Sequence, residues 1–323
     1  MFVLMDNLKL IVENINSNKL DLALKQCDVY NVKENKYLIN NLIGVIYSLK
    51  KNQELAENYF NKSHKLNEKF EDPLKNLYIL NIRKKSYPEA INIAQKLCNL
   101  NNSNDLFFYQ LAYAYELNSN NLLAIDNYEK CKNLNGKNKL KALNNIGNIY
   151  LKNNKPKTSL KYFLEANEIE KNDKIIVNNI LLNYIKLKDE NNSDRYFEIS
   201  KKLDSKHIEF IYNEAQYYIF KEKFDKAIEL LDNHKDKSKF LIILIELYFN
   251  MGNFKEGELL LNSIRNEIKK DNNFFNYIGI RSLREGNFED GWKFYESRGS
   301  KTTSYLKEIK EWNGEKLENK SIV

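Results

Sequence analysis

The sequence predicts an all-α fold, and three features of it support that prediction. Glycine and proline are scarce, at 10 and 3 of 323 residues, whereas tyrosine and phenylalanine number 21 and 17. So few breakers argue against a chain of short strands and tight turns. Apolar residues recur at the helical spacing i, i+3, i+4 and i+7. The same order of small and aromatic residues also returns about every 34 residues. We therefore expect paired helices joined by short polar turns.

The period is clearest where residues 40–67, 108–135 and 143–170 are aligned. Each segment has a small residue, an aromatic three residues later, a second small residue, and a second aromatic four residues after that. The carriers are Gly44, Tyr47, Ala56 and Phe60, then Ala112, Tyr115, Ala124 and Tyr128, then Gly147, Tyr150, Ser159 and Phe163. Continuing this frame places repeat starts near residues 4, 37, 71, 105, 140, 174, 208, 238 and 272.

These units resemble the tetratricopeptide repeat, whose pattern has a small residue at position 8, Tyr at 11, Ala at 20 and an aromatic at 24. The resemblance implies a right-handed α-α superhelix, a solenoid of about nine helix-turn-helix repeats, over residues 1–298. One amphipathic helix pair cannot bury its apolar stripes alone, so each unit is expected to stack on the next. Residues 299–323, where the period stops, are predicted to be a linker to a further domain.

In tetratricopeptide arrays the first helix of each repeat faces a concave groove, and amides are frequent at the groove positions of this chain. Position 6 carries Asn76, Gln110, Asn145, Asn179 and Asn213, and position 5 adds Asn41, Asn144, Asn178 and Asn276. A carboxamide offers both a donor and an acceptor, so such a column suits the peptide groups of an extended polypeptide. It resembles the asparagine ladder of O-linked N-acetylglucosamine transferase, which implies peptide binding. The alternative is a structural role, because asparagine is abundant here and also bonds within helix pairs.

Two further sets of groove positions carry charge or aromatic rings. Position 13 holds Arg83, Lys152, Lys186 and Arg284, which we expect to contact acidic groups of a partner. The alternative for these cations is solvation at helix ends, where positive charge suits the helix dipole. Tyr109, Tyr113 and Tyr212 are predicted to be buried stacking aromatics, with exposure to the groove as the alternative.

The last expected repeat carries a motif of its own. Trp292, Tyr295, Glu296 and Arg298 precede Trp312, Gly314, Leu317 and Lys320. This order resembles the junction in bacterial proteins that fuse a tetratricopeptide array to a glycosyltransferase-like domain. The resemblance implies that Trp292, Tyr295, Glu296, Arg298 and Trp312 seat a following domain, and that the array recognises an acceptor polypeptide. A free-standing adaptor that assembles a protein complex is the second hypothesis, with Trp292 and Trp312 as hydrophobic caps.

Catalysis by the chain itself is not predicted. The sequence contains no nucleophile elbow, phosphate-binding loop, zinc-protease motif or dinucleotide fingerprint. Cys27, Cys98 and Cys131 stand apart from one another and lack metal-ligand spacing, so each is expected to be a small apolar residue of a second helix. We predict neither a cofactor nor a metal.

The remaining expectations concern partners and location. Lys and Arg exceed Asp and Glu by 51 to 44, but the charges are interspersed, so nucleic acid is not a predicted partner. No stretch approaches the apolar length of a membrane span, and the start lacks signal-peptide features, so we expect no membrane contact and a cytoplasmic protein. The predicted partner is a protein or extended peptide, and pairing of arrays through terminal repeats is left open.

Overall fold

The computed structural model describes residues 2–30, 35–203, 208–234, 238–264, 279, 282–283 and 286–295, and every regular element in them is an α-helix. The first helices of the pairs are α1 (Phe2–Asn16), α3 (Lys36–Leu49), α5 (Asp72–Lys84), α7 (Asp105–Leu117), α9 (Lys139–Lys152), α11 (Lys174–Leu187), α13 (Ile208–Phe220) and α15 (Ser238–Asn250). The second helices are α2 (Leu20–Val29), α4 (Gln53–Leu66), α6 (Tyr87–Leu100), α8 (Asn121–Asn133), α10 (Pro156–Ile169), α12 (Glu190–Leu203), α14 (Phe224–Asp232), α16 (Phe254–Ile264) and α18 (Phe288–Tyr295). The predicted all-α class is confirmed.

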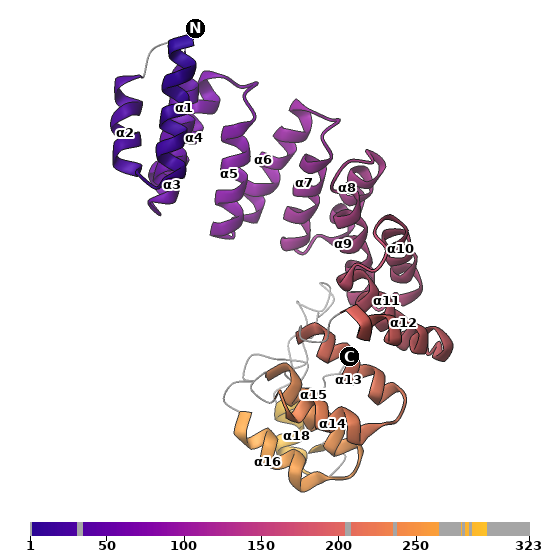
Figure 1. Cartoon of the computed structure of the whole chain (residues 1–323). Coiled ribbons are helices and arrows are strands. Elements are labelled where there is room, and N and C mark those ends of the chain that lie inside the picture. Colours follow the sequence, from indigo (N-terminus) through magenta and orange to yellow (C-terminus); the bar gives the residue numbers. More distant parts are fainter. Residues whose placement is uncertain are drawn as a thin grey trace, which may run out of the picture. The chain divides into compact units, whose positions relative to one another are not determined.

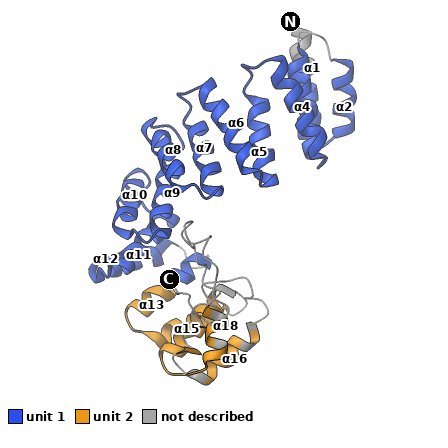
Figure 2. Cartoon of the chain, turned by 180° about the vertical axis from the view of Figure 1, so that it is seen from behind, with its two compact units in different colours: residues 1–213 blue, residues 214–323 orange. Residues whose placement is uncertain are grey.

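The chain divides into two compact units, residues 1–213 and residues 214–323, and the division falls within α13 (Figure 2). In the first unit the helix pairs follow one another side by side in chain order (Figure 1). Each second helix from α2 to α10 contacts both its own first helix and the first helix of the next pair. In the second unit α15 contacts α14 and α16. Stacking of neighbours in chain order is the arrangement of a solenoid.

A left-handed residue ends the first helix in each turn that the structure describes between the two helices of a pair. These residues have φ between 54° and 81° and are Asn18, Lys51, Lys85, Ser119, Asn154, Lys188, Glu222, Gly252 and Gly286. The next residue donates its backbone N–H to a carbonyl five residues earlier, as Asn120 does to Tyr115 at 2.9 Å. This is the hydrogen bond of a Schellman motif, which satisfies carbonyls at a helix end. All nine residues stand at position 15 of the repeat frame.

The small residues at positions 8 and 20 permit close contact between helices. A Cβ added to Gly44 would meet the Phe60 ring at 2.5 Å, and one added to Gly147 would meet the Phe163 ring at 2.7 Å. The position-20 residues from the first repeat to the seventh have no exposed surface: Ala23, Ala56, Ala90, Ala124, Ser159, Ser193 and Ala227. In these two repeats the small residue at position 8 therefore packs directly against the aromatic ring at position 24 of the same repeat.

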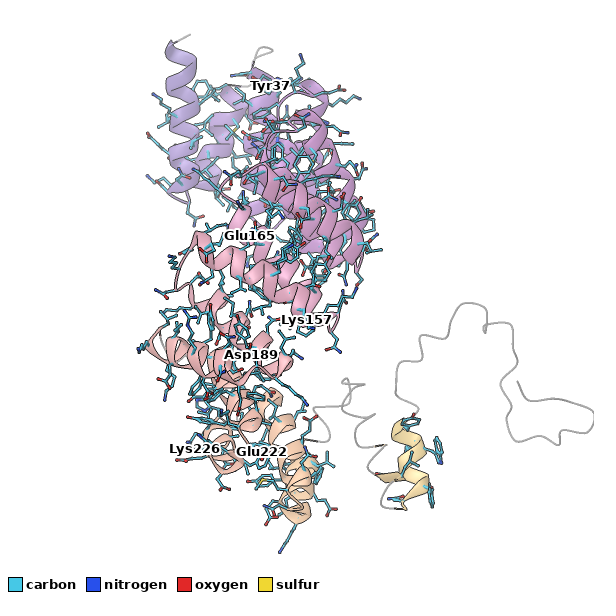
Figure 3. All side chains as sticks on the ribbon, turned by 90° about the vertical axis from the view of Figure 1, so that its right-hand side faces the viewer. Tyr37, Lys157, Glu165, Asp189, Glu222 and Lys226 are labelled. Carbon is cyan, nitrogen blue, oxygen red and sulfur yellow. The ribbon has the colours of Figure 1, made fainter. Side chains whose placement is uncertain are left out.

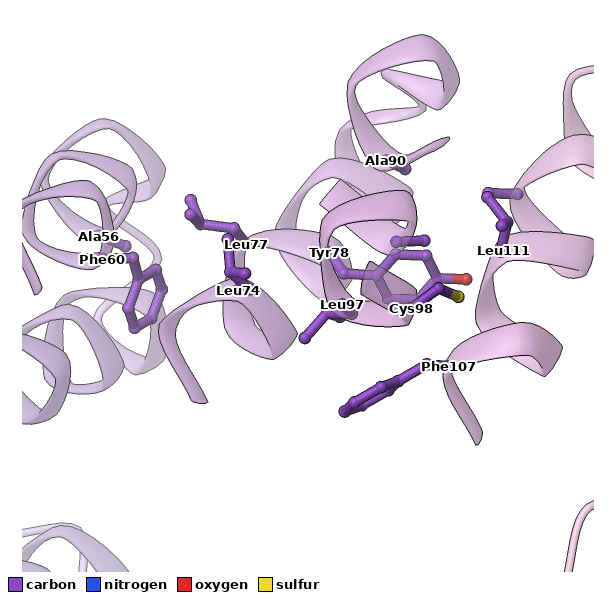
Figure 4. Packing of buried hydrophobic residues seen from close by; sticks show 12 residues of the cluster. Ala56, Phe60, Leu74, Leu77, Tyr78, Ala90, Leu97, Cys98, Phe107 and Leu111 are labelled. Carbon is purple, nitrogen blue, oxygen red and sulfur yellow. The ribbon is translucent and has the colours of Figure 1, made fainter. Parts of the chain in front are cut away.

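Apolar side chains from successive helices form a series of buried clusters. One cluster joins α4 to α7, with the Tyr78 ring and Cys98 lying between Leu74 and Leu111 (Figure 4). A side-chain hydrogen bond also links α4 to α3. The buried Ser63 hydroxyl donates to the backbone oxygen of Tyr37 at 2.6 Å, and Tyr37, which is labelled in Figure 3, lies at the start of α3.

The three cysteines lie in second helices, on α2, α6 and α8, and all are buried free thiols. Burial raises the pKa of Cys27 to about 12, of Cys98 to about 11 and of Cys131 to about 12. They pack as small apolar residues, as predicted.

Candidate binding face on the first helices

First helices of neighbouring pairs approach one another closely in the first unit. α3 contacts α5 directly, and α9 contacts α11, although a second helix lies between each two in the chain. Positions 5 and 6 therefore face each other across neighbouring repeats. The predicted amides of one repeat therefore lie within hydrogen-bond distance of those of the next.

Two asparagine pairs form the same bond in different parts of the unit. Asn76 Nδ2 donates to Asn41 Oδ1 at 3.0 Å, and Asn179 Nδ2 donates to Asn144 Oδ1 at 3.1 Å. In both pairs a position-6 amide donates to the position-5 amide of the preceding repeat. We call the hydrogen bonds from position 6 to the preceding position 5 the inter-repeat ladder.

In two other repeats the position-6 amide also donates to the position-5 residue of the preceding repeat, but the acceptor is a tyrosine hydroxyl or a backbone oxygen. Asn145 Nδ2 donates to the Tyr109 hydroxyl at 3.3 Å and to the Tyr128 hydroxyl at 2.7 Å. Asn213 Nδ2 donates to the backbone oxygen of Asn178 at 3.2 Å. Four of the five predicted column members thus tie their repeat to the one before it.

Gln110 is the exception, for a reason visible in the sequence. The preceding repeat has Lys75 at position 5, and an ammonium group has no acceptor to offer. Helices α5 and α7 are linked instead by the Tyr78 hydroxyl, which donates to the backbone oxygen of Gln110 at 2.8 Å. The Gln110 side-chain oxygen is buried and has no hydrogen-bond partner.

Exposure separates the predicted groove residues into two groups. Asn41, Asn178 and Asn213 keep at most 8% of their surface and are packed between helices. Asn144 is half-buried and accepts a ladder bond. The other three position-6 asparagines, Asn76, Asn145 and Asn179, are half-buried, and their side-chain oxygens accept no bond yet are not enclosed. These oxygens reach solvent. Asn276 lies outside the described residues.

Positions 6, 9 and 13 fall on one side of each first helix, because they are spaced i, i+3 and i+7. On α5, α7, α9 and α11 these positions hold Asn76, Ile79 and Arg83, then Gln110, Tyr113 and Leu117, then Asn145, Asn148 and Lys152, then Asn179, Leu182 and Lys186. We call this set the first-helix face. Ile79 and Tyr113 remain 43% and 36% exposed, so the face combines amide oxygens with accessible apolar surface.

The cations of the face are exposed at the ends of their helices. Arg83, Lys152 and Lys186 are all exposed, and Lys152 Nζ lies 3.9 Å from Glu116 Oε1. An exposed pair at that distance is weak, so it does not fix the Lys152 side chain. Arg284, the fourth predicted cation, lies outside the described residues.

Side chains of α7, α8 and α9 form a network whose hydrogen bonds were not predicted from the sequence. Its Tyr113 ring is 36% exposed, so the prediction that this ring is buried is wrong. The Tyr109 ring stacks on Tyr113 at 6.5 Å and contacts the Tyr128 ring at 5.5 Å. Tyr128, which is fully buried, donates its hydroxyl to Glu116 Oε2 at 2.9 Å and accepts from Asn145. We call Tyr109, Tyr113, Glu116, Tyr128 and Asn145 the repeat-4 cluster. Burial raises the pKa of Tyr109 and of Tyr128, so both phenols stay protonated.

Comparison with known proteins identifies the repeat. Residues 38–70 and 140–173 match the family model of the tetratricopeptide repeat. The chain contains tetratricopeptide repeats. No curated protein matches the sequence.

Solved structures agree on the fold of this tetratricopeptide solenoid. The C-terminal part of a TPR repeat-containing protein from Cytophaga hutchinsonii has a TM-score of 0.58 at 17% identity, over 70% of this chain and 93% of that one. A tetratricopeptide repeat protein from Parabacteroides merdae has a TM-score of 0.54 at 12% identity, over 80% and 99%. Pseudomonas aeruginosa pilF has a TM-score of 0.51 at 13% identity, over 70% and 98%. These likenesses concern the fold, and none supports the glycosyltransferase resemblance.

The last described helix, α18, holds two of the predicted junction residues. Trp292 is 54% exposed, and its ring meets the Tyr295 ring edge-on at 5.7 Å. Glu296, Arg298 and Trp312 lie outside the described residues. The assignment of these five residues to a domain junction stays a prediction, as do the array boundary at residue 298 and the linker over 299–323.

The described residues offer neither a metal site nor a membrane span. Among the residues that the structure places, no group of His, Cys, Asp or Glu side chains is arranged to hold a metal ion. None of the described helices has the length and apolar character needed to cross a membrane. Tyr212 lies half-buried in α13.

Proposed function

We propose that this tetratricopeptide solenoid is a protein-binding scaffold whose first-helix face holds an extended polypeptide. The inter-repeat ladder is the observation that carries the proposal. Each of Asn76, Asn145 and Asn179 has its amide N–H tied to the preceding repeat while its oxygen reaches solvent. The ladder therefore fixes the direction of a row of acceptors, which suits the backbone N–H groups of an extended chain.

The dimensions of the two partners are compatible. Packed helices lie about 8–10 Å apart and an extended chain advances about 3.3 Å per residue, so about three residues of a bound segment correspond to one repeat. Because the ladder already orders the amides, binding loses less side-chain entropy than it would with free asparagines. Ile79 and Tyr113 then offer apolar contacts to side chains of the segment.

A matched pair of charge insertions tests the location of the binding face. Peptides selected from a random library against the full chain provide the probe. Ile79→Glu places a charge on the first-helix face, and Leu122→Glu places one on α8, where Leu122 is 83% exposed. We expect Ile79→Glu to weaken the selected peptides about tenfold, or ~1.4 kcal/mol, and Leu122→Glu to leave their affinity unchanged. Loss of binding only in Leu122→Glu would refute the first-helix face.

A narrower proposal concerns the context of the scaffold. An acceptor-recognising arm of a glycosyltransferase-type protein is supported only by the exposed Trp292 beside Tyr295, because large exposed apolar groups often mark contact surfaces. A free-standing adaptor is consistent with the matched repeats. Sequencing the transcript beyond the codon for Val323 separates the two. An in-frame nucleotide-sugar-binding domain supports the arm, and an immediate stop codon supports the adaptor.

A further inference from the structure

The first helices of the binding face differ in the sign of their charges. α9 carries Lys139, Lys141 and Lys152 and no carboxylate, and α11 carries two lysines and no carboxylate. α7 is the reverse, because its sequence DLFFYQLAYAYEL has two carboxylates and no cation. Near the C-terminal ends of these helices, at positions 12 and 13 of the repeat, the charged residues are Arg83 on α5, Glu116 on α7, Lys152 on α9 and Lys186 on α11, so the order of charge is positive, negative, positive, positive.

The carboxylate on α7 is held in a fixed position. Glu116 accepts the Tyr128 hydroxyl at 2.9 Å through Oε2, and Tyr128 is itself fully buried and bonded to Asn145. The Glu116 side chain keeps 20% exposure, so its outer edge remains accessible. Tyr109, Tyr113 and Glu116 follow one another at i, i+4 and i+7, so the stacked rings and the carboxylate share one side of α7.

The Glu116 carboxylate accepts the Tyr128 hydroxyl through Oε2, and it lies on the same side of α7 as the stacked Tyr109 and Tyr113 rings. Among the described residues, the cation that approaches Glu116 is Lys152, whose Nζ lies 3.9 Å from Oε1 and whose side chain is 74% exposed, so it competes weakly. A guanidinium group fits this environment because it stacks on aromatic rings and has five N–H donors in one plane.

We propose that the repeat-4 cluster selects an arginine of the bound polypeptide, and that acidic residues flank this arginine about three residues away on either side. The arginine would stack on Tyr113 and pair with Glu116, and the acidic residues would face Arg83, Lys152 and Lys186. This inference rests on the proposed function, since it assumes an extended segment along the first-helix face. It assigns that segment the charge order acidic, basic, acidic, acidic at intervals of about three residues.

The test uses the full chain and capped peptides of the pattern E-x-x-R-x-x-E-x-x-E and its reverse, with serine and alanine elsewhere. The same peptides with citrulline in place of arginine keep the shape and remove the charge. Dissociation constants are measured by fluorescence anisotropy at low and moderate salt. We expect the arginine peptide to bind about tenfold more tightly than the citrulline peptide, because a charge-assisted pair is lost.

Variants of the chain assign that preference to its site. Glu116→Gln keeps an acceptor for the Tyr128 hydroxyl and should reduce the arginine-to-citrulline ratio to about one. Asp126→Asn, at an exposed carboxylate on α8, should leave the ratio unchanged. If Glu116→Gln proves unstable, Tyr113→Ala, at a 36% exposed ring, should lower the ratio several-fold.

The outcomes separate the two proposals. Equal binding of the arginine and citrulline peptides would overturn the inference and leave the scaffold function standing. A ratio that survives both Glu116→Gln and Tyr113→Ala would also overturn it. If neither these peptides nor any library peptide binds the chain, both proposals are refuted.

Discussion

Asn179 donates its side-chain N–H to the Oδ1 of Asn144, one repeat earlier in the chain, at 3.1 Å. Asn76 and Asn41 make the same bond three helix pairs nearer the N-terminus. The amide column is thus built into the stacking of the solenoid. One N–H of each donor amide holds neighbouring repeats together, and the side-chain oxygens of Asn76, Asn145 and Asn179 are left for a partner.

The ladder bond should contribute measurably to stability. Asn179→Ala removes the donor and leaves Asn144 unpaired, so we expect a loss of about 1 kcal/mol in the free energy of unfolding. Asn148→Ala is the matched control, because Asn148 lies on α9, is half-buried and makes no bond in the described chain. Both substitutions replace asparagine by alanine within a helix, so they change the helix propensity equally. The difference between their free energies of unfolding, measured by urea denaturation, therefore reports the hydrogen bond. Equal stabilities of the two variants would show that the ladder bond contributes nothing.

Contact between position 8 and position 24 should be sensitive to one added methyl group. In Gly147→Ala the new Cβ would lie 2.7 Å from the Phe163 ring, so we expect a loss of about 1–3 kcal/mol. The double variant Gly147→Ala with Phe163→Leu should recover part of this loss, because leucine leaves room for the methyl group. Thermal unfolding of the three proteins provides the measurement. No recovery in the double variant would mean that the clash is not with Phe163.

Replacing lysine by glycine at the left-handed turn position should stabilise the protein. Lys85 has φ of 61°, a conformation that glycine adopts without strain. We expect Lys85→Gly to raise the free energy of unfolding by about 0.5–1 kcal/mol. Lys161→Gly, on an exposed interior position of α10, should lower it by about 1 kcal/mol. Destabilisation by both substitutions would indicate that the Lys85 side chain has a role of its own.

The thiols should be inert in the native protein at neutral pH. Burial raises the pKa of Cys98 to about 11 and of Cys27 and Cys131 to about 12. The reactive thiolate therefore forms only in strong alkali unless the chain unfolds. A colourimetric thiol reagent at pH 8 should label none of the three cysteines in buffer and all three in guanidinium chloride. Fast labelling of Cys98 in buffer would show that α6 opens readily.

Much of the repeat packing was predictable because it depends on residue size at fixed spacing. The small residue at position 8, such as Gly147, and the aromatic residue at position 24, such as Phe163, recur at a fixed spacing in the sequence, and they pack together in the structure. The left-handed position was less predictable. Lys51 and Lys188 stand where Asn or Gly would be expected, and lysine carries no signal for that conformation.

The sequence could not show which amides of the column bond to the preceding repeat. The sequence shows the same carboxamide at position 6 whether its N–H groups face a ligand or the preceding repeat. The acceptor is also distant in the sequence, since Asn144 precedes Asn179 by 35 residues. The one available signal was Lys75, which cannot accept a bond and so leaves Gln110 outside the ladder. The repeat-4 cluster depends on Tyr128 having a hydroxyl where Phe60 and Phe163 have none, and only the structure shows that it reaches Glu116.

The most direct test of the central claim is to locate a bound polypeptide on the chain. A library-selected peptide carrying benzoylphenylalanine at its centre is photo-crosslinked to the full protein, and the adducts are mapped by mass spectrometry. The account predicts adducts on the first-helix face, at residues of α5, α7, α9 or α11 such as Ile79 and Tyr113. Adducts confined to the second helices α6, α8 and α10 would contradict it.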